Sequence, residues 1–245
     1  MTVGGRLTFL LKSFNNSFVY RRLAKMGFTQ VPVDAGTNKA RGALVVLEGC
    51  DRSGKTTQAH MLVKALVDAG KPTVFMCFPD RTTHIGGIIN SYLKCDQELD
   101  DHAIHLLFSA NRWELLPKIL STLQEGTNII IDRYAYSGVA FSAAKKDMSL
   151  EWCKQSDAGL PQPDLVLFLD VCEKEAQTRG QFGEERYEKR EFQKRVRDNY
   201  LRLKDDSWKV IDANESIEKL QETLKEEVLN AIKKEKNESI QKLWV

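Results

Sequence analysis

The run from Gly49 to Thr56, Gly-Cys-Asp-Arg-Ser-Gly-Lys-Thr, matches the Gly-x4-Gly-Lys-[Ser/Thr] pattern of a phosphate-binding loop. It follows an apolar, β-prone run at 43–47 and precedes an amphipathic helical stretch, which is the setting that the pattern requires. The glycines let the backbone curl until several N–H groups point at one anion, in front of the positive end of the next helix. Lys55 then reaches the outer phosphates, and the Thr56 hydroxyl is a ligand for Mg²⁺. A glycine-rich helix entry without a ligand is the alternative, which the flanking strand and helix disfavour.

Further apolar runs have the length and composition of buried strands, and stretches of helical periodicity separate them. These runs are 73–78, 127–131, 164–170 and 208–212. With the run at 43–47 they predict an α/β fold, a doubly wound sheet of five buried parallel strands with helices on both faces. One amphipathic helix is predicted to extend without a break from Asp100 to Gln124.

The composition indicates one domain with a sizeable core, because 245 residues include 42% hydrophobic residues. The 36 basic and 34 acidic side chains leave a net charge of +2, which indicates neither a nucleic acid nor a membrane as partner. The five cysteines are scattered, odd in number and never in Cys-x-x-Cys spacing. This pattern favours a protein of a reducing cell compartment over one with a disulfide framework or a structural zinc site. No apolar run approaches the length of a membrane span.

The first 40 residues differ in composition from the rest of the chain. The first 33 contain no Asp or Glu and carry scattered Arg and Lys among Ser, Asn, Leu and Phe, which is typical of a mitochondrial transit peptide. A disordered basic arm is the alternative. Initiation at Met26 would give a form for the cytoplasm or nucleus. We therefore expect a leader and linker at 1–40 and a catalytic domain at 41–245.

Charged side chains follow two predicted strands at the edge where open α/β sheets bind ligands. Arg81 comes after the second strand, and Asp132 with Arg133 ends the third. An acid and a base at such a position place one charge toward a metal and the other toward phosphate, whereas a simple ion pair is the alternative. Phe108 and Arg112 lie four residues apart and so share a helix face.

The stretch 179–188 is rich in charge, poor in aliphatic residues and contains two glycines. It predicts a mobile flap between helices, from which Arg179 and Arg186 swing over bound phosphates. A solvated helix face is the alternative.

Several ordered motifs together resemble the thymidylate kinases of the eukaryotic kind, from about Arg41 to the C-terminus. They are Asp51-Arg52-x-Gly-Lys-Thr-Thr, Phe78-Pro79-Asp80-Arg81, the run 107–114, Asp132-Arg133-Tyr134 through 137–141, Gly159-Leu160-Pro161-x-Pro163-Asp164 and Gly183-x-Glu185-Arg186-Tyr187-Glu188. The resemblance implies a P-loop NTPase-type fold with a lid, and phosphorylation of dTMP to dTDP by MgATP in dTTP synthesis. It also implies a homodimer.

The resemblance assigns roles on the ATP side. Arg52, Lys55 and Asp132 are the expected catalytic residues, and Thr56 and Asp132 are expected to serve Mg²⁺. Arg52 matches a loop arginine that neutralises charge on the transferring phosphoryl group, and Arg179 matches a flap residue over adenine. The expected ATP-binding set is Gly49, Asp51, Arg52, Ser53, Gly54, Lys55, Thr56, Thr57 and Arg179.

On the dTMP side, the resemblance places Asp51 at the 3′-hydroxyl and Arg81 and Arg133 at the phosphate. Phe108 is the expected platform for the base, and Arg112 the donor to thymine O4. The other expected contacts are Phe78, Ser137, Gly138, Phe141 near the deoxyribose, and Tyr187 and Gln193 at the border of the nucleotide. Asp80 stands where relatives often carry Glu.

Two other functions remain open at this point. A deoxynucleoside kinase shares the fold but accepts a neutral nucleoside, whereas two arginines at strand ends favour a substrate that already carries a phosphate. A nucleotide switch would signal through shape, but no guanine-recognition motif is apparent.

Overall fold

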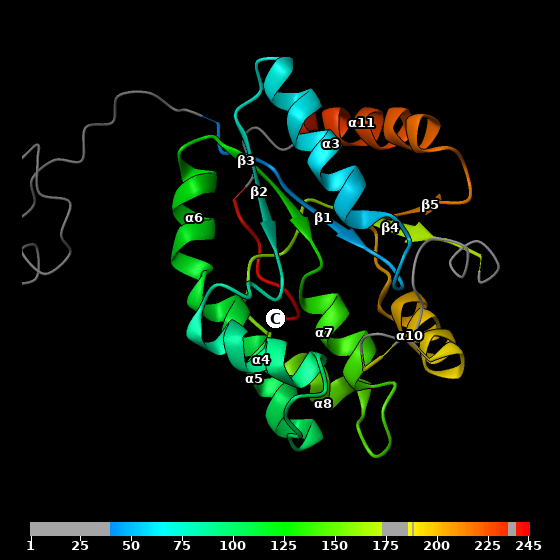
Figure 1. The fold of residues 1–245 in the computed structure, drawn as a ribbon. Coiled ribbons are helices and arrows are strands. Elements are labelled where there is room, and N and C mark those ends of the chain that lie inside the picture. Colours follow the sequence, from blue (N-terminus) through cyan, green and yellow to red (C-terminus); the bar gives the residue numbers. More distant parts are fainter. Residues whose placement is uncertain (1–39, 173–185, 188, 235–238) are drawn as a thin grey trace, which may run out of the picture. The chain divides into compact units, whose positions relative to one another are not determined.

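The computed structural model describes residues 40–172, 186–187, 189–234 and 239–245. Within these ranges five strands form one parallel sheet in the order β2-β3-β1-β4-β5 (Figure 1). The strands are β1 (Leu44–Glu48), β2 (Thr73–Cys77), β3 (Asn128–Asp132), β4 (Leu165–Asp170) and β5 (Trp208–Asp212). The predicted doubly wound sheet is confirmed.

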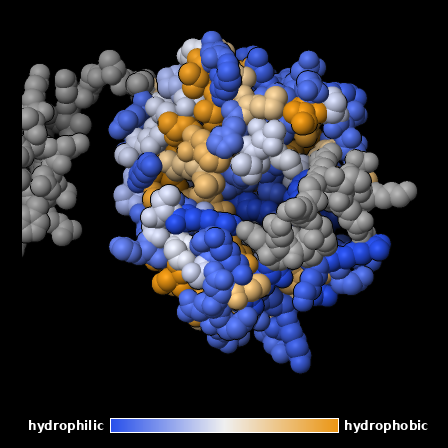
Figure 2. Space-filling view, viewed as in Figure 1, coloured by the Kyte–Doolittle hydropathy of each residue, from blue (hydrophilic) through white to orange (hydrophobic). Residues whose placement is uncertain are grey.

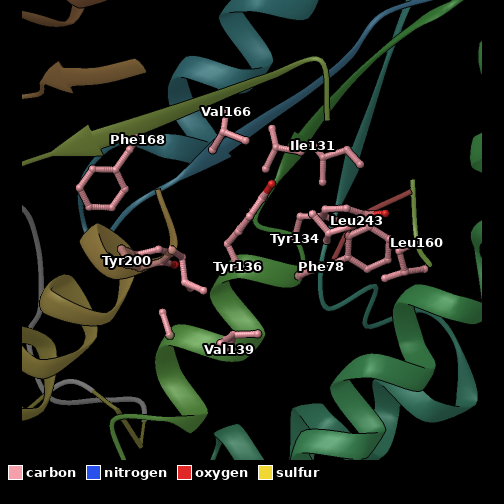
Figure 3. Close-up of a cluster of buried hydrophobic side chains, with 14 of the residues drawn as sticks. Phe78, Ile131, Tyr134, Tyr136, Val139, Leu160, Val166, Phe168, Tyr200 and Leu243 are labelled. Carbon is pink, nitrogen blue, oxygen red and sulfur yellow. The ribbon is translucent and has the colours of Figure 1, made fainter. Parts of the chain in front are cut away.

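Helices cover both faces of the sheet, because alternate residues of each central strand point to opposite sides. In β1, Val45 and Leu47 pack with α3 and α11, whereas Leu44 and Val46 pack in a second cluster with α6, α7, α8 and α10. Figure 3 shows part of this second cluster, including Tyr136, Val139 and Tyr200. The helices are α3 (Lys55–Asp68), α4 (His84–Leu93), α5 (Asp101–Glu114), α6 (Leu116–Gln124), α7 (Ala135–Ser142), α8 (Leu150–Gln155), α10 (Arg190–Leu203) and α11 (Ile217–Lys234).

The expectation that all five strands are buried is wrong for the two at the edges. In β2, Val74 is 36% exposed and Cys77 is also exposed, and in β5 only Trp208 is buried. An edge strand is covered less completely than a central one, and the short apolar runs do not distinguish the two positions. The central strands β1 and β3 are buried along their whole length.

The single helix predicted from Asp100 to Gln124 is also wrong, because the chain forms two helices, α5 and α6, that meet at Leu115. Asp100 is the N-cap of α5, where its carboxylate accepts hydrogen bonds from the N–H groups of His102 and Ala103. Pro117 lies in the first turn of α6 and lacks the N–H group that a continuous helix needs. The break lets α5 and α6 take different directions.

The strand register brings the predicted site segments to one edge. Asp132, the last residue of β3, pairs with Leu47 of β1 on one side and Cys77 of β2 on the other. The loop that follows β1, the arginine that follows β3 and the Phe78-Pro79 step after β2 therefore begin beside one another. This is the carboxyl edge at which open parallel sheets bind ligands.

The chain divides into the units 1–38 and 39–245, and the second contains all of the described residues. The predicted leader at 1–40 therefore lies, apart from residue 40, outside the described residues. Among the described helices, none has the length and apolar character needed to cross a membrane.

Candidate active site

The loop between β1 and α3 has the backbone that the phosphate-binding pattern predicts. Gly49 and Gly54 have φ angles of 148° and 92°, and Arg52 is also left-handed with a φ of 65°. A Cβ atom on Gly49 would lie 2.6 Å from the carbonyl oxygen of Leu169, so a side chain does not fit there. Gly54 is the N-cap of α3, and the loop therefore delivers its N–H groups to the positive end of that helix.

Lys55 is held across this loop. It is 5% exposed, and its Nζ donates to the carbonyl oxygen of Cys50 at 2.7 Å and to Oγ of Ser53 at 3.2 Å. Burial lowers the pKa of the Lys55 ammonium to about 8, and the positive charge of Arg133 acts in the same direction. Bound phosphates would supply the negative charge that favours the ammonium form.

Thr56 and Asp132 lie side by side, as the prediction for a metal site requires. Oγ1 of Thr56 donates a short hydrogen bond to Oδ2 of Asp132. Oδ1 of Asp132 is buried, and in the described residues no donor reaches it. The described ranges contain no group of three or more His, Cys, Asp and Glu side chains that could hold a metal. One carboxylate and one hydroxyl suit Mg²⁺, which keeps several waters and binds substrate phosphates.

Asp51 joins the loop to the residues after β3 and to α10. Its carboxylate accepts a short hydrogen bond from Nη2 of Arg133 and one of 2.5 Å from Nε2 of Gln193. The side-chain oxygen of Gln193 in turn accepts the Asp51 N–H at 3.1 Å, and its amide nitrogen also donates to the carbonyl oxygen of Tyr187. Gln193 therefore positions Asp51.

The loop after β2 carries Arg81, whose Nη1 donates to Oδ1 of Asn90 at 3.0 Å. Asn111 of α5 fixes the start of this loop, because its side-chain amide binds both the N–H and the carbonyl oxygen of Asp80. The Asp80 carboxylate accepts from the N–H and the hydroxyl of Thr82. Asn111 is fully buried, and the sequence analysis missed it although it lies next to Arg112.

One pocket is lined by all of the predicted dTMP-side residues except Gln193. Gln193 instead forms hydrogen bonds with Asp51, which does line the pocket. Figure 2 shows this face of the molecule hollowed near its centre, where hydrophilic residues gather. The pocket is lined by Asp51, Phe78, Pro79, Arg81, Leu93, Phe108, Arg112, Arg133, Tyr134, Ser137, Gly138, Phe141, Ser142 and Tyr187.

At one side of the pocket Arg112 forms a buried ion pair with Asp157. Nε donates to Oδ1 at 3.0 Å and Nη2 to Oδ2 at 2.6 Å, in the parallel geometry of an arginine and a carboxylate. The two side chains are 2% and 0% exposed. Asp157 is not among the residues predicted from the sequence, because no fixed spacing connects it to Arg112.

A second buried carboxylate, Glu48 at the end of β1, organises the start of α7. Its Oε1 accepts from the N–H groups of Tyr134 and Ser137, and its Oε2 accepts from the hydroxyls of Ser137 and Tyr200. Burial raises the pKa of Glu48, while the hydrogen bond from Ser137 and the charge of Arg133 oppose the rise. Glu48 thus fixes the turn that presents Arg133 and Ser137. The sequence analysis missed this residue too.

Aromatic rings close the pocket on the side of the predicted flap. Tyr187 stacks on Phe192 with ring centroids 5.1 Å apart and meets Phe141 edge-on at 5.6 Å. Arg186 does not lie over the phosphate loop: it forms an ion pair with Glu98 at 2.7 Å and lies over the ring of Tyr92 at 4.1 Å. Arg179, which is expected over adenine, lies outside the described residues.

The other residues of the predicted ATP-binding set differ in exposure. Ser53 is fully buried beneath Lys55, and Thr57 is exposed in the first turn of α3.

Comparisons with known proteins agree with this geometry. Residues 47–224 match the model of the family described as thymidylate kinase. The thymidylate kinases of Danio rerio and Homo sapiens are 49% and 48% identical over 207 residues, which cover 83% of this chain and 98% of each relative. A solved thymidylate kinase from Candida albicans superposes with a TM-score of 0.76 at 39% identity, covering 83% of this chain and 99% of that one. The chain belongs to the thymidylate kinase family.

Proposed function

We infer that the chain phosphorylates dTMP to dTDP with ATP as the phosphoryl donor, the reaction of its family and a step in dTTP synthesis. The observation that carries this function is that Arg81 and Arg133 line the same pocket as Phe108 and Arg112, beside the phosphate-binding loop. Two cations there suit an acceptor that already carries a phosphate, with its base at the far side. A neutral deoxynucleoside brings no negative charge for these two arginines to bind.

At the ATP end, Lys55 and the loop N–H groups hold the phosphates, and Arg52 neutralises the charge that develops on the transferring phosphoryl group. Arg179 is assigned to the adenine side. The acceptor is a phosphate oxygen, so the reaction needs alignment and charge neutralisation rather than a strong general base. Closure of the flap would exclude water, which otherwise accepts the phosphoryl group.

We assign Mg²⁺ to Thr56 and Asp132. The buried Oδ1 of Asp132 supports this assignment, since no donor in the described residues reaches it. The ion neutralises charge on the ATP phosphates when it is bound. Thr56 and Asp132 orient each other through their hydrogen bond.

At the dTMP end, Asp51 accepts from the 3′-hydroxyl while Gln193 fixes its carboxylate. Phe108 stacks on the pyrimidine, and Arg112 donates to thymine O4. Cytosine presents an amino donor at the same position, so it would leave donors unpaired on both sides. Phe141 crowds the 2′ position and disfavours ribonucleotides. We expect dTMP to be the best acceptor, dUMP to be weaker and dCMP to be effectively excluded.

A homodimer is the proposed assembly. On α5 an apolar stripe at helical spacing faces outward, comprising Ala103, Leu106, Ala110 and Trp113, and Leu106 is 49% exposed. Ile88 of α4 is 41% exposed. A stripe of this kind on a soluble chain favours association with a second copy. Sedimentation of wild type and Leu106→Glu tests it, because a monomer at all concentrations for the wild type would contradict the dimer.

For localisation, we propose that the leader directs the long form to mitochondria and that initiation at Met26 gives a cytoplasmic or nuclear form. Residues 1–33 fused to a fluorescent reporter test this, and a diffuse cytosolic signal would contradict it.

A coupled assay of ADP release, run with dTMP, with thymidine and with no acceptor, tests the proposed reaction. We expect ADP release to depend on dTMP. A response to thymidine instead would indicate a nucleoside kinase, and equal release without an acceptor would contradict both kinase functions.

A further inference from the structure

The buried pair of Arg112 and Asp157 determines which donors reach the base end of the pocket. A guanidinium has five N–H groups, and Asp157 accepts one from Nε and one from Nη2. Both N–H groups of Nη1 and the second of Nη2 lie outside this pair, and Arg112 lines the pocket. Asp157 lies behind Arg112 rather than among the lining residues.

Gly138 fixes the guanidinium from a second direction. A Cβ atom at Gly138 would lie 2.6 Å from Nη2 of Arg112 and 3.1 Å from both Cζ and Nη1. Because the Cβ position of Gly138 is close to three guanidinium atoms of Arg112 at once, the α7 backbone packs against the guanidinium. The group is therefore held along one edge by Asp157 and packed against the backbone of α7.

The turn that carries Asp157 is attached directly to the helix that carries Arg112. The carbonyl oxygen of Ser156 accepts from Oγ of Ser109 at 2.8 Å and from Nε1 of Trp113 at 2.7 Å. Ser109 lies three residues before Arg112 on α5, and Trp113 lies next to it. Asp157 therefore keeps its place relative to α5 through contacts that do not involve its own carboxylate.

The C-terminal segment 239–245 supports the same turn from its other side. The carbonyl oxygen of Leu243 accepts the N–H of Gly159 at 2.9 Å, and the N–H of Leu243 donates to Leu160 at 2.8 Å. Leu243 is 1% exposed and packs in the cluster that contains Phe78 and Tyr134, two residues of the pocket wall (Figure 3). The turn is thus fixed between α5 and the end of the chain.

We propose that Asp157 is a positioning residue that sets base selectivity through Arg112. It holds the guanidinium so that the free edge meets an acceptor at position 4 of a pyrimidine and opposes a donor there. The negative charge of Asp157 also balances the positive charge of Arg112. The base end therefore offers directed hydrogen bonds without a net positive charge that would attract the phosphate of dTMP. This inference rests on the proposed function.

The test is the ratio of kcat/KM for dTMP to that for dCMP in Asp157→Asn, measured at high enzyme concentration for dCMP. The amide places a donor against one N–H of Arg112, so the guanidinium turns. We expect the ratio to fall about tenfold or more, mainly through the KM for dTMP. The KM for ATP should change little, because the change lies at the base end.

Asp164→Asn is the matched control. Asp164 also accepts two hydrogen bonds from one arginine, from Nη1 and Nη2 of Arg41 at 2.7 and 2.6 Å, and the two side chains are 7% and 12% exposed. It lies just before β4 and outside the pocket. This variant should lose stability and keep the ratio. Comparison of the two variants separates selectivity from a general loss of packing.

A double variant tests whether Asp157 acts only through Arg112. The ratio for Arg112→Ala with Asp157→Asn should equal that for Arg112→Ala alone. An additive loss in the double variant would overturn the proposal, as would an unchanged ratio in Asp157→Asn.

If Asp157→Asn does not fold, Asp157→Glu keeps the charge and displaces the guanidinium by the length of one methylene. It should also lower the ratio, and an unchanged ratio would overturn the proposal. A wild-type protein without activity on dTMP would contradict the proposed function itself. A selective wild type with equally selective Asp157 variants would contradict only the role of Asp157.

Discussion

The two ends of the pocket are built in different ways. The phosphate end is formed by one continuous loop, with Lys55 bonded back onto Cys50 and Ser53, and by Asp132 from the neighbouring strand. The base end is assembled from α5, α7 and the turn at 156–160, with the C-terminal segment behind that turn. Local backbone geometry is sufficient to bind phosphate, whereas a base must be read by a side chain whose direction is fixed from several sides.

The two ends also differ in net charge: the phosphate end is positive, whereas the base end is neutral. Lys55, Arg81 and Arg133 bring positive charge to the end that we assign to the phosphates of both substrates. Arg112 is neutralised by Asp157 before any ligand arrives. Affinity for phosphate therefore depends on net charge, and selectivity for the base depends on the direction of hydrogen bonds.

Arg52→Gly should have the largest effect, because it removes charge at the phosphate end while it preserves the loop. Arg52 has a φ of 65°, a conformation that glycine adopts readily. We expect kcat to fall on the order of 10²-fold or more, with a smaller change in KM, since the charge acts mainly in the transition state. Steady-state kinetics with ATP and dTMP measure both constants.

Cys50→Ala in the same loop is the control for Arg52→Gly and should remain active. An unchanged kcat with a raised KM for ATP in Arg52→Gly would show that Arg52 binds only the ground state.

The sequence predicts the phosphate end well because its chemistry depends on local spacing. The pattern at 49–56 and the charges that follow the strands predict that Lys55, Thr56 and Asp132 gather at one edge of the sheet, and in the structure they lie together there. Pro117 also carried a signal for the break between α5 and α6, since proline in a helix interior removes a hydrogen bond. The prediction of one continuous helix did not use that signal.

The partners of the site residues were not predictable in this way. Asp157 is 45 residues from Arg112, and Glu48 is 89 residues from Ser137. Each is a carboxylate whose role depends on a tertiary contact rather than on a pattern in the chain. The sequence predicted the strands β2 and β5 but not their partial exposure, because a strand's position in the sheet follows from the assembled fold.

Leu243→Ala should affect the base end next, through the support of the turn at 156–160. Leu243 is buried in the main core, so its truncation should cost about 2–3 kcal/mol of unfolding free energy, and we also expect a higher KM for dTMP. Chemical denaturation and steady-state kinetics measure the two effects.

Val245→Ala is the matched control at the same terminus, because Val245 is 89% exposed. It should change neither quantity. Loss of stability without any change in the KM for dTMP would show that the C-terminal segment supports only the core.

Gly138→Ala should disturb the base end with a smaller effect. The added methyl group meets a guanidinium that Asp157 prevents from moving away, and overpacking of this kind costs about 1–2 kcal/mol. If the guanidinium turns to relieve this contact, we expect a KM for dTMP roughly tenfold higher, with the KM for ATP nearly unchanged.

Gly87→Ala in α4 controls for the effect of alanine in a helix, because a Cβ there meets nothing within 4 Å. It should raise stability by about 0.5–1 kcal/mol and leave both KM values unchanged. If Gly138→Ala behaves like Gly87→Ala, the guanidinium is free to shift, and the rigidity assigned to the base end is wrong.

The smallest predicted effect is the contribution of His105, at the base end, to the pH dependence of stability. His105 of α5 is fully buried, and its Nε2 donates to the carbonyl oxygen of Cys153 at 3.0 Å while Nδ1 accepts from Oγ of Ser142 at 2.8 Å. Burial lowers the pKa of His105 below its usual 6.5, and the positive charge of Arg112 lowers it further. The folded protein therefore keeps this ring neutral at a pH at which the unfolded chain binds a proton.

Because the unfolded state binds more protons in this range, stability is lost as the pH falls below about 6.5, by at most about 1.4 kcal/mol per pH unit. Denaturation of the unliganded protein at pH 7, 6 and 5.5 should show a steeper loss for the wild type than for His105→Gln. Equal slopes of unfolding free energy against pH for the wild type and His105→Gln would mean that the fold tolerates a protonated ring beside Arg112. The base end would then be less rigid than we infer.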